Sequence, residues 1–240
     1  MATSSGSGTG FALCGSPQRL VLTGELPRAP VRIVLSDELA AWSDRPVHAI
    51  ATRDRHRRPP LIRLGPFTPP GIYQATLESD GQRHPVTVTV APAPMLSADP
   101  SGLLFAGPPG SGVTAHIALC NRGNTGVTIP TRAKVGLYDD DGLEFAFADT
   151  YRQKQSDPAN LVGNWLQRLR EGYGGLLRLD IVQGAGALEP GAARMLEVQA
   201  TLPEQARARH AYHGIWSVGS LNCLVEVSVD RQPGSGGAIQ

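Results

Sequence analysis

The segment nearest to a known ligand-binding motif is glycine-rich, Gly107-Pro-Pro-Gly-Ser-Gly-Val-Thr114. It differs from a phosphate-binding P-loop at Val113, where that motif has a lysine that neutralises the β- and γ-phosphates. A P-loop also opens a helix, whereas Ala115-His-Ile-Ala-Leu119 alternates like a strand. We therefore interpret the segment as a Gly/Pro turn that leads into a strand.

Two other clusters contain side chains that can bind metal ions. The segment Asp139-Asp-Asp-Gly-Leu-Glu144 has four carboxylates, but consecutive acids point apart, which favours an acidic turn over a calcium loop. His210 and His213 have helical spacing, but they precede a strand and have no third ligand nearby. No Gly-x-Ser-x-Gly elbow occurs either. We expect no metal, no cofactor and no catalytic site; a hydrolase assembled from distant residues is left as the third alternative.

The densest charge is the basic run Arg53-Asp-Arg-His-Arg-Arg58. Its Arg55, Arg57 and Arg58 could clamp phosphate, nucleic acid or an acidic protein, or simply form a solvated hairpin loop. Nucleic acid is disfavoured because no aromatic residue interrupts the run and the net charge of the chain is only +1. We expect these three arginines to contact a protein partner.

The composition indicates what kind of element positions these side chains. The 28 Gly and 20 Pro among 240 residues predict many turns and hence many short strands. Hydrophobic residues, at 41%, suffice for packed cores, while 18% charged and 5% aromatic residues suit β-sandwiches better than helical bundles. A chain of this length accommodates two domains of ordinary size.

The first half reads as a series of strands with turn residues between them. We expect strands at 19–23, 31–35, 47–52, 61–64, 71–78 and 85–90. Valines alternate with threonines in the last, which is typical of a strand with one buried face. The dipeptide Asp80-Gly81 predicts a tight hairpin before it. This strand count predicts an immunoglobulin-like β-sandwich over 11–92.

A stiff Ala91-Pro-Ala-Pro-Met95 linker marks the boundary to a second immunoglobulin-like sandwich over 93–230. We expect its strands at 113–120, 127–129, 133–138, 195–202 and 224–229. The ends of the chain, 1–10 and 231–240, are rich in glycine and serine, and we expect flexible tails there. The fold class is thus all-β, with two tandem sandwiches.

One segment breaks the β pattern, and we assign it to an insertion at 139–185. Apolar residues from Leu161 to Leu169 repeat at helical spacing, with Asp157 as N-cap and Pro158 at the first helical position. An insertion on a β scaffold is where specificity usually lies. We expect the contact surface there, with Leu161, Trp165, Leu169 and Tyr173 as its anchors.

Several phrases resemble bacterial Ig-like modules of the CARDB-type and glycosidase-associated kind. They are Thr114-Ala-His-Ile-Ala-Leu-Cys-Asn-Arg-Gly-Asn-Thr-Gly126, Leu188-Glu-Pro-Gly191 with the following Leu202-Pro-Glu-Gln205, the Tyr212-His-Gly214 region and Pro70-Gly-Ile-Tyr73. The resemblance covers 105–138 and 186–229, and the first domain only thinly. It implies a β-sandwich that binds proteins or sugars or spaces other domains apart.

The cysteines and the N-terminal residues indicate in which cellular compartment the protein is expected. Cys14, Cys120 and Cys223 make an odd count, so we favour free thiols, with a Cys120–Cys223 bridge left open. The first residues lack a basic and an apolar region, and no run of 18 apolar residues occurs, so we expect no signal peptide and no membrane span. We expect a cytoplasmic protein, or export by another route.

These observations together favour a non-catalytic structural or interaction protein. We expect it to self-assemble or to dock into a larger protein complex, because exposed sheet edges pair readily with other chains. The alternative is a carbohydrate- or small-ligand-binding module, which exposed aromatic platforms on a sheet face would favour.

Overall fold

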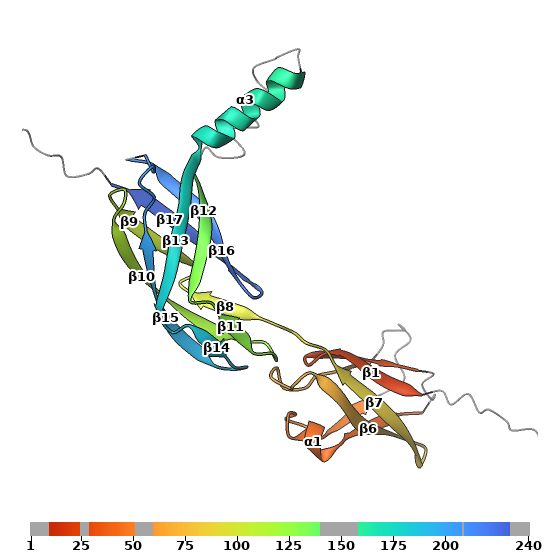
Figure 1. The fold of residues 1–240 in the computed structure, drawn as a ribbon. Coiled ribbons are helices and arrows are strands. Elements are labelled where there is room, and N and C mark those ends of the chain that lie inside the picture. Colours follow the sequence, from red (N-terminus) through yellow and green to blue (C-terminus); the bar gives the residue numbers. More distant parts are fainter. Residues whose placement is uncertain (1–9, 25–28, 51–59, 140–157, 208, 231–240) are drawn as a thin grey trace, which may run out of the picture. The chain divides into compact units, whose positions relative to one another are not determined.

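The computed structural model describes residues 10–24, 29–50, 60–139, 158–207 and 209–230 (Figure 1). The chain divides into two compact units, and each has its own β-sheet and its own hydrophobic core. Unit 1 comprises residues up to Met95 together with Asn121–Gly126 and Glu189–Gly191. The predicted all-β class with two tandem β-sheet domains is confirmed.

Unit 1 is built on a seven-stranded sheet in the order β4-β3-β6-β7-β1-β2-β5. The strands and one short helix are β1 Phe11–Ser16, β2 Arg19–Thr23, β3 Val31–Leu35, α1 Asp37–Ala40, β4 Val47–Ile50, β5 Leu61–Ile62, β6 Gly71–Ser79 and β7 Gln82–Val90. All neighbouring strands are antiparallel except β1 and β7, which are parallel. The strands β4 and β5 are the two edges of this sheet.

Buried and exposed side chains alternate along the strands of unit 1, and the buried ones form a single hydrophobic core. In β7 the three valines are buried while Thr87 is exposed, as their alternation predicts. The β6–β7 hairpin turns at Asp80 and Gly81, whose φ angles of 49° and 74° are those of a tight primed turn, so this prediction is also confirmed. Asn124 is buried in this unit, where it accepts from Ala93 N at 2.6 Å and donates to Thr68 O at 3.0 Å.

Unit 2 contains an eight-stranded sheet in the order β8-β10-β15-β13-β12-β16-β17-β9 and a small β11-β14 sheet. Its elements are β8 Leu96–Asp99, β9 Gly102–Gly107, β10 Gly112–Asn121, β11 Val127–Ile129, β12 Arg132–Asp139, α3 Pro158–Glu171, β13 Tyr173–Gln183, β14 Gly186–Leu188, β15 Ala193–Thr201, β16 Ala211–Val218 and β17 Leu221–Val229. The inward side chains of its strands form one cluster that includes Trp216. The Gly/Pro turn before β10 leads into a strand, as predicted.

The range 139–185 that the sequence analysis assigns to an insertion divides into two parts in the structure. The helix α3 begins at Pro158 and is followed directly by β13 (Figure 1). The strand β13 is central in the sheet, between β15 and β12, so Tyr173–Gln183 belongs to the sandwich core and not to an insertion. Alternating Leu177, Leu179 and Ile181 are its buried face, a pattern the sequence analysis overlooked.

The three cysteines are free: Cys14 is exposed, Cys120 half-buried and Cys223 buried. Cys120 lies on β10 and Cys223 on β17, strands that are not neighbours in the sheet. Burial raises the pKa of the Cys223 thiol, which keeps it protonated and poorly nucleophilic. The expected flexible tails lie outside the described residues, apart from Gly10.

Candidate interaction surface

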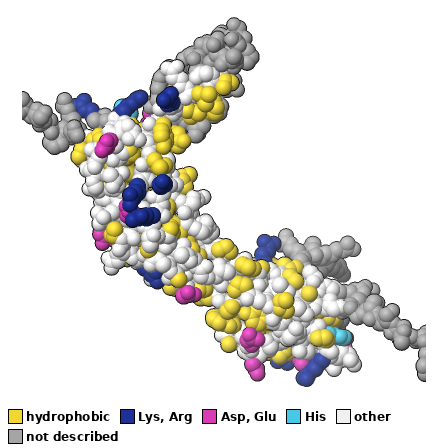
Figure 2. Space-filling model, in the orientation of Figure 1, with side chains coloured by type: hydrophobic (Ala, Val, Ile, Leu, Met, Phe, Trp, Pro, Cys, Tyr) yellow, Lys and Arg dark blue, Asp and Glu magenta, His cyan; other side chains and the backbone are white. Residues whose placement is uncertain are grey.

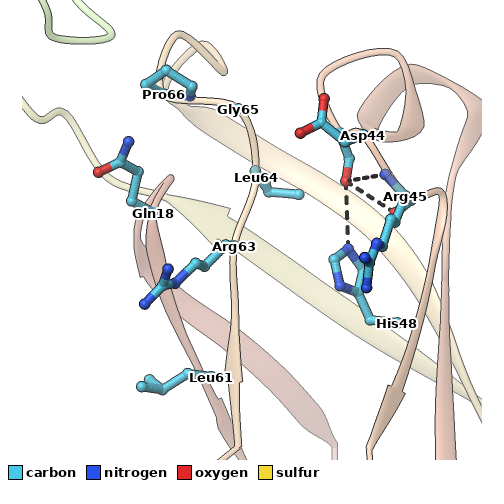
Figure 3. Close-up of a pocket in the computed structure, with 10 residues that line it drawn as sticks. Gln18, Asp44, Arg45, His48, Leu61, Arg63, Leu64, Gly65 and Pro66 are labelled. Atoms are coloured by element: carbon cyan, nitrogen blue, oxygen red, sulfur yellow. Dashed lines mark hydrogen bonds between the residues drawn. The ribbon is translucent and has the colours of Figure 1, made fainter.

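Unit 1 has an open cleft of about 770 Å³ between its two edge strands. One wall comes from β4 and the turn before it, with Asp44, Arg45 and His48, and the other from Leu61 and Arg63 (Figure 3). The described residues that line the cleft include no Phe, Tyr or Trp, so these residues offer no large aromatic ring on which a sugar could stack.

His48 is the titratable group whose pKa this environment shifts. Its ring Nε2 lies 3.4 Å from the Ser43 hydroxyl, which donates to the Arg45 carbonyl at 2.9 Å and accepts from Arg45 N at 3.2 Å (Figure 3). Burial, and then the positive charge of Arg45, lower the pKa of His48 from its usual 6.5. The cleft therefore favours a neutral imidazole.

The outer sides of three neighbouring strands in unit 2, β16, β17 and β9, carry apolar residues beside one another. Ile215 pairs with Leu224, and Leu224 lies beside Gly102. We call these three residues the apolar row. Paired residues on neighbouring strands share a face, so the row is one continuous strip of surface.

A second row lies directly beside the apolar row. Its members, in the order of the strands in the sheet, are Tyr173, Tyr138, His213, Glu226 and Leu104. The strands β12 and β16 pair at Tyr138–His213 and Asp139–Tyr212. The tyrosine rings lie 5.5 Å apart.

The exposed apolar side chains of β16, β17 and β9 form a patch. Leu104, Ile215 and Leu224 are each between 44% and 64% exposed. Hydrophobic side chains reach the surface of unit 2 near the base of α3 (Figure 2). Single exposed leucines are ordinary on protein surfaces, whereas a contiguous apolar patch marks an interaction site.

Polar residues border the apolar row on its other side. Ser217 pairs with Asn222, and the Ser217 hydroxyl donates to Asn222 Oδ1 at 2.7 Å. An apolar centre with a polar rim is the usual anatomy of a protein–protein interface.

The residues proposed from the sequence as contacts are only partly brought together. Tyr173 is exposed and belongs to the second row. Trp165 and Leu169 are half-buried on α3, while Val162 and Leu166 are more exposed than either. The side chain of Leu161 lies outside the described residues, as do Arg55, Arg57 and Arg58. The roles of Leu161, Trp165, Leu169 and the arginines therefore stay predictions.

The sequence analysis missed Leu104, Ile215 and Leu224. The sequence contains one signal for them, a leucine at an outward position of a strand whose inward positions are already apolar, as in Leu103-Leu-Phe105. That signal indicates a strand with two apolar faces, and such a strand usually has both faces covered. It does not show that the three residues are neighbours, because they come from three strands.

Within the described ranges, no group of three or more His, Cys, Asp or Glu side chains is arranged to hold a metal ion. His213 lies inside β16 and not before it, and the ring of His210 stacks on Tyr212. None of the described helices is long and apolar enough to cross a membrane.

No family model matches the chain, and no curated protein matches it. Solved structures resemble it distantly. The ASH/PapD-like domain 7 of human CEP192 is 15% identical over 57% of this chain and 87% of that one, with a TM-score of 0.31. Domains 4 and 5 of the S-layer protein SbsC are 13% identical over 68% and 66% (TM-score 0.28), and the I9–I11 tandem of titin 9% identical over 91% and 65% (TM-score 0.24).

These similarities are to Ig-like and S-layer modules and assign no family. The narrower resemblance to CARDB-type modules is therefore supported only at the level of β-sandwiches. TM-scores this low transfer no function, so function has to be argued from the side chains of this chain.

Proposed function

We propose that the chain is a non-catalytic interaction protein that docks a protein partner through the outer face of β16, β17 and β9. The apolar row supports this proposal most directly, because its two large side chains, Ile215 and Leu224, are paired with each other and exposed to water. Exposing them to solvent costs about 25 cal/mol per Å² of apolar surface, and a partner that covers them recovers that energy.

Tyr138 and Tyr173 and the polar border of the apolar row also support a role in protein binding. Tyrosine is enriched at interfaces because it supplies a large rigid contact area together with a hydroxyl group. The small-ligand alternative has less support, since the described residues that line the cleft of unit 1 are mostly polar and include no Phe, Tyr or Trp.

A photo-cross-linking amino acid placed at Ile215 tests this function in the cells that produce the protein. The same residue at His116, which is exposed on β10 outside the patch, is the matched control. We expect one discrete cross-linked protein from position 215, little from position 116, and loss of the product when Leu224→Asp is added. Equal products from both positions, or none from position 215, would contradict the proposal.

A third position separates the sheet face from the helix. A cross-linker at Leu166, exposed on α3, tests the sequence-based prediction that the helix is part of the contact surface. A product from position 166 with the same partner extends the interface to α3. A product from position 215 alone restricts it to the sheet.

A further inference from the structure

We propose that the cleft of unit 1 binds an extended, acidic segment of a partner protein, which adds as a further strand to the free edge of β4. This site goes beyond the proposed function, because it lies in unit 1 and uses none of the residues of the apolar row. Three features of the cleft support it: unpaired backbone groups on the strands that border it, a volume that fits one strand, and an excess of positive charge.

The strand β4 has backbone groups that its own sheet leaves unpaired. The Leu35 N–H donates to the Pro46 carbonyl at 3.0 Å, which fixes the hydrogen-bonding phase of the β3–β4 ladder. Hydrogen-bonded pairs recur at every second residue of an antiparallel ladder, so Val47 and Ala49 do not bond to β3. Their N–H and C=O groups therefore point to the free edge, where they can pair with an added strand.

The strand β5, on the opposite wall, has the same feature. The Leu22 N–H donates to the Pro60 carbonyl at 3.2 Å, and the β2–β5 ladder continues through the pair of Leu20 and Ile62. By the same alternation, the N–H and C=O groups of Leu61 point away from β2. Both β4 and β5 are edges of the sheet, so a strand that enters the cleft meets unpaired backbone groups on both of them.

The size of the cleft matches a single strand. Strands lie about 4.8 Å apart within a sheet and sheets pack about 10 Å apart, so a strand occupies a cross-section of about 48 Å². A volume of about 770 Å³ then holds about 16 Å of strand, which is about five residues. The cleft is therefore too small for a folded domain and suits an extended segment.

The charge on the walls favours an acidic segment. Arg45 on one wall and Arg63 on the other carry two positive charges, against the one carboxylate of Asp44 (Figure 3). Within the described ranges none of these three side chains makes an ion pair. The two arginine side chains do not converge in Figure 3, so a strand with several acidic side chains suits them better than one small anion.

The residues that join the two walls in the sequence add to the positive charge. Between β4 and β5 the chain reads Ala51-Thr-Arg-Asp-Arg-His-Arg-Arg-Pro59, with four arginines and one aspartate. These residues lie outside the described ranges and are not part of the proposed site. Their charge attracts an acidic partner over a distance and so raises its association rate. Their sequence does not alternate between apolar and polar residues, which favours a strand from another chain as the occupant.

Fluorescence anisotropy of the full chain with a labelled peptide tests the site. The probe is a fluorescein-labelled heptapeptide in which valine alternates with glutamate. We expect saturable binding with a dissociation constant below about 1 mM. We expect at least about ten-fold weaker binding when lysine replaces glutamate, because of charge, and when the backbone amides of the glutamate peptide are N-methylated, because that peptide cannot pair with a strand edge.

Variants of the two walls test the charge. We expect Arg45→Glu and Arg63→Glu each to raise the dissociation constant of the glutamate peptide at least about ten-fold. The matched control is Arg83→Glu on β7, which is not among the residues that line the cleft, and we expect it to change the constant less than about two-fold. Far-ultraviolet circular dichroism verifies that each variant is folded like the wild type.

Three outcomes would overturn the proposal. The first is a glutamate peptide that does not saturate the chain at about 1 mM. The second is equal binding of the N-methylated peptide, which would indicate an anion site without strand pairing. The third is an equal effect of Arg83→Glu and the two wall variants. Cross-linking from Ile215 is measured separately, so this site and the proposed function of the apolar row can each fail without the other.

Discussion

At the scale of single residues, His48 gives unit 1 a defined dependence on pH. Its pKa in the folded protein lies below the usual 6.5, so the unfolded chain binds the proton more readily than the folded one. The stability that this histidine contributes is present above about pH 6.5 and is lost as the pH falls through the folded pKa. Acid conditions therefore weaken unit 1 through this group.

We expect the urea midpoint of unit 1 to decrease as the pH is lowered from about 8 to about 5. In His48→Gln we expect this decrease in the midpoint to be smaller. The other histidines remain in both proteins, so their contributions cancel in the comparison. Far-ultraviolet circular dichroism in urea at several pH values measures both midpoints. Identical pH dependence in the two proteins would show that His48 is not the group responsible.

At the scale of elements, the β6–β7 hairpin depends on the left-handed backbone of its turn. Gly81 has φ +74° and nothing lies within 4 Å of a Cβ placed there, so a substitution meets conformational strain without a steric clash. We expect Gly81→Ala to lower the free energy of unfolding by about 1 kcal/mol, because a non-glycine residue in this region costs about 1–2 kcal/mol.

The matched variant is Gly81→Asn, which also removes the glycine but tolerates this backbone conformation. Urea denaturation should rank the wild type above Gly81→Asn, and Gly81→Asn above Gly81→Ala. An equal loss for Ala and Asn would mean that the turn needs the absence of a side chain and not merely a left-handed residue.

At the scale of the whole molecule, two separate cores predict two cooperative unfolding transitions. Leu77 is fully buried in the core of unit 1, and Leu179 is fully buried in that of unit 2. Truncating a buried leucine to alanine costs about 2–5 kcal/mol. We expect Leu77→Ala to lower the temperature of one transition and Leu179→Ala that of the other.

Differential scanning calorimetry of the full chain resolves this directly. Each variant should move a single peak and leave the other within error, since domains with their own cores unfold as separate units. A single peak that both substitutions shift equally would show one cooperative structure instead.

Much of the local structure could be predicted from the sequence because it is set by neighbours in the chain. Period-two alternation predicted β7, the Asp80-Gly81 dipeptide predicted its hairpin, and Pro158 predicted where α3 begins. The separation into two β domains followed from turn density and the proline-rich linker. Each of these signals is contained within a few residues, so no long-range pairing is needed to interpret it.

The apolar row could only be found in the tertiary structure. Gly102, Ile215 and Leu224 are spread over more than half the length of unit 2. They form one surface because the strand order places β16, β17 and β9 side by side in a particular register. Alternation in the sequence determined which residues of one strand share a face. Strand pairing decided which strands adjoin, and it depends on contacts between residues far apart in the chain that together give the core its lowest free energy.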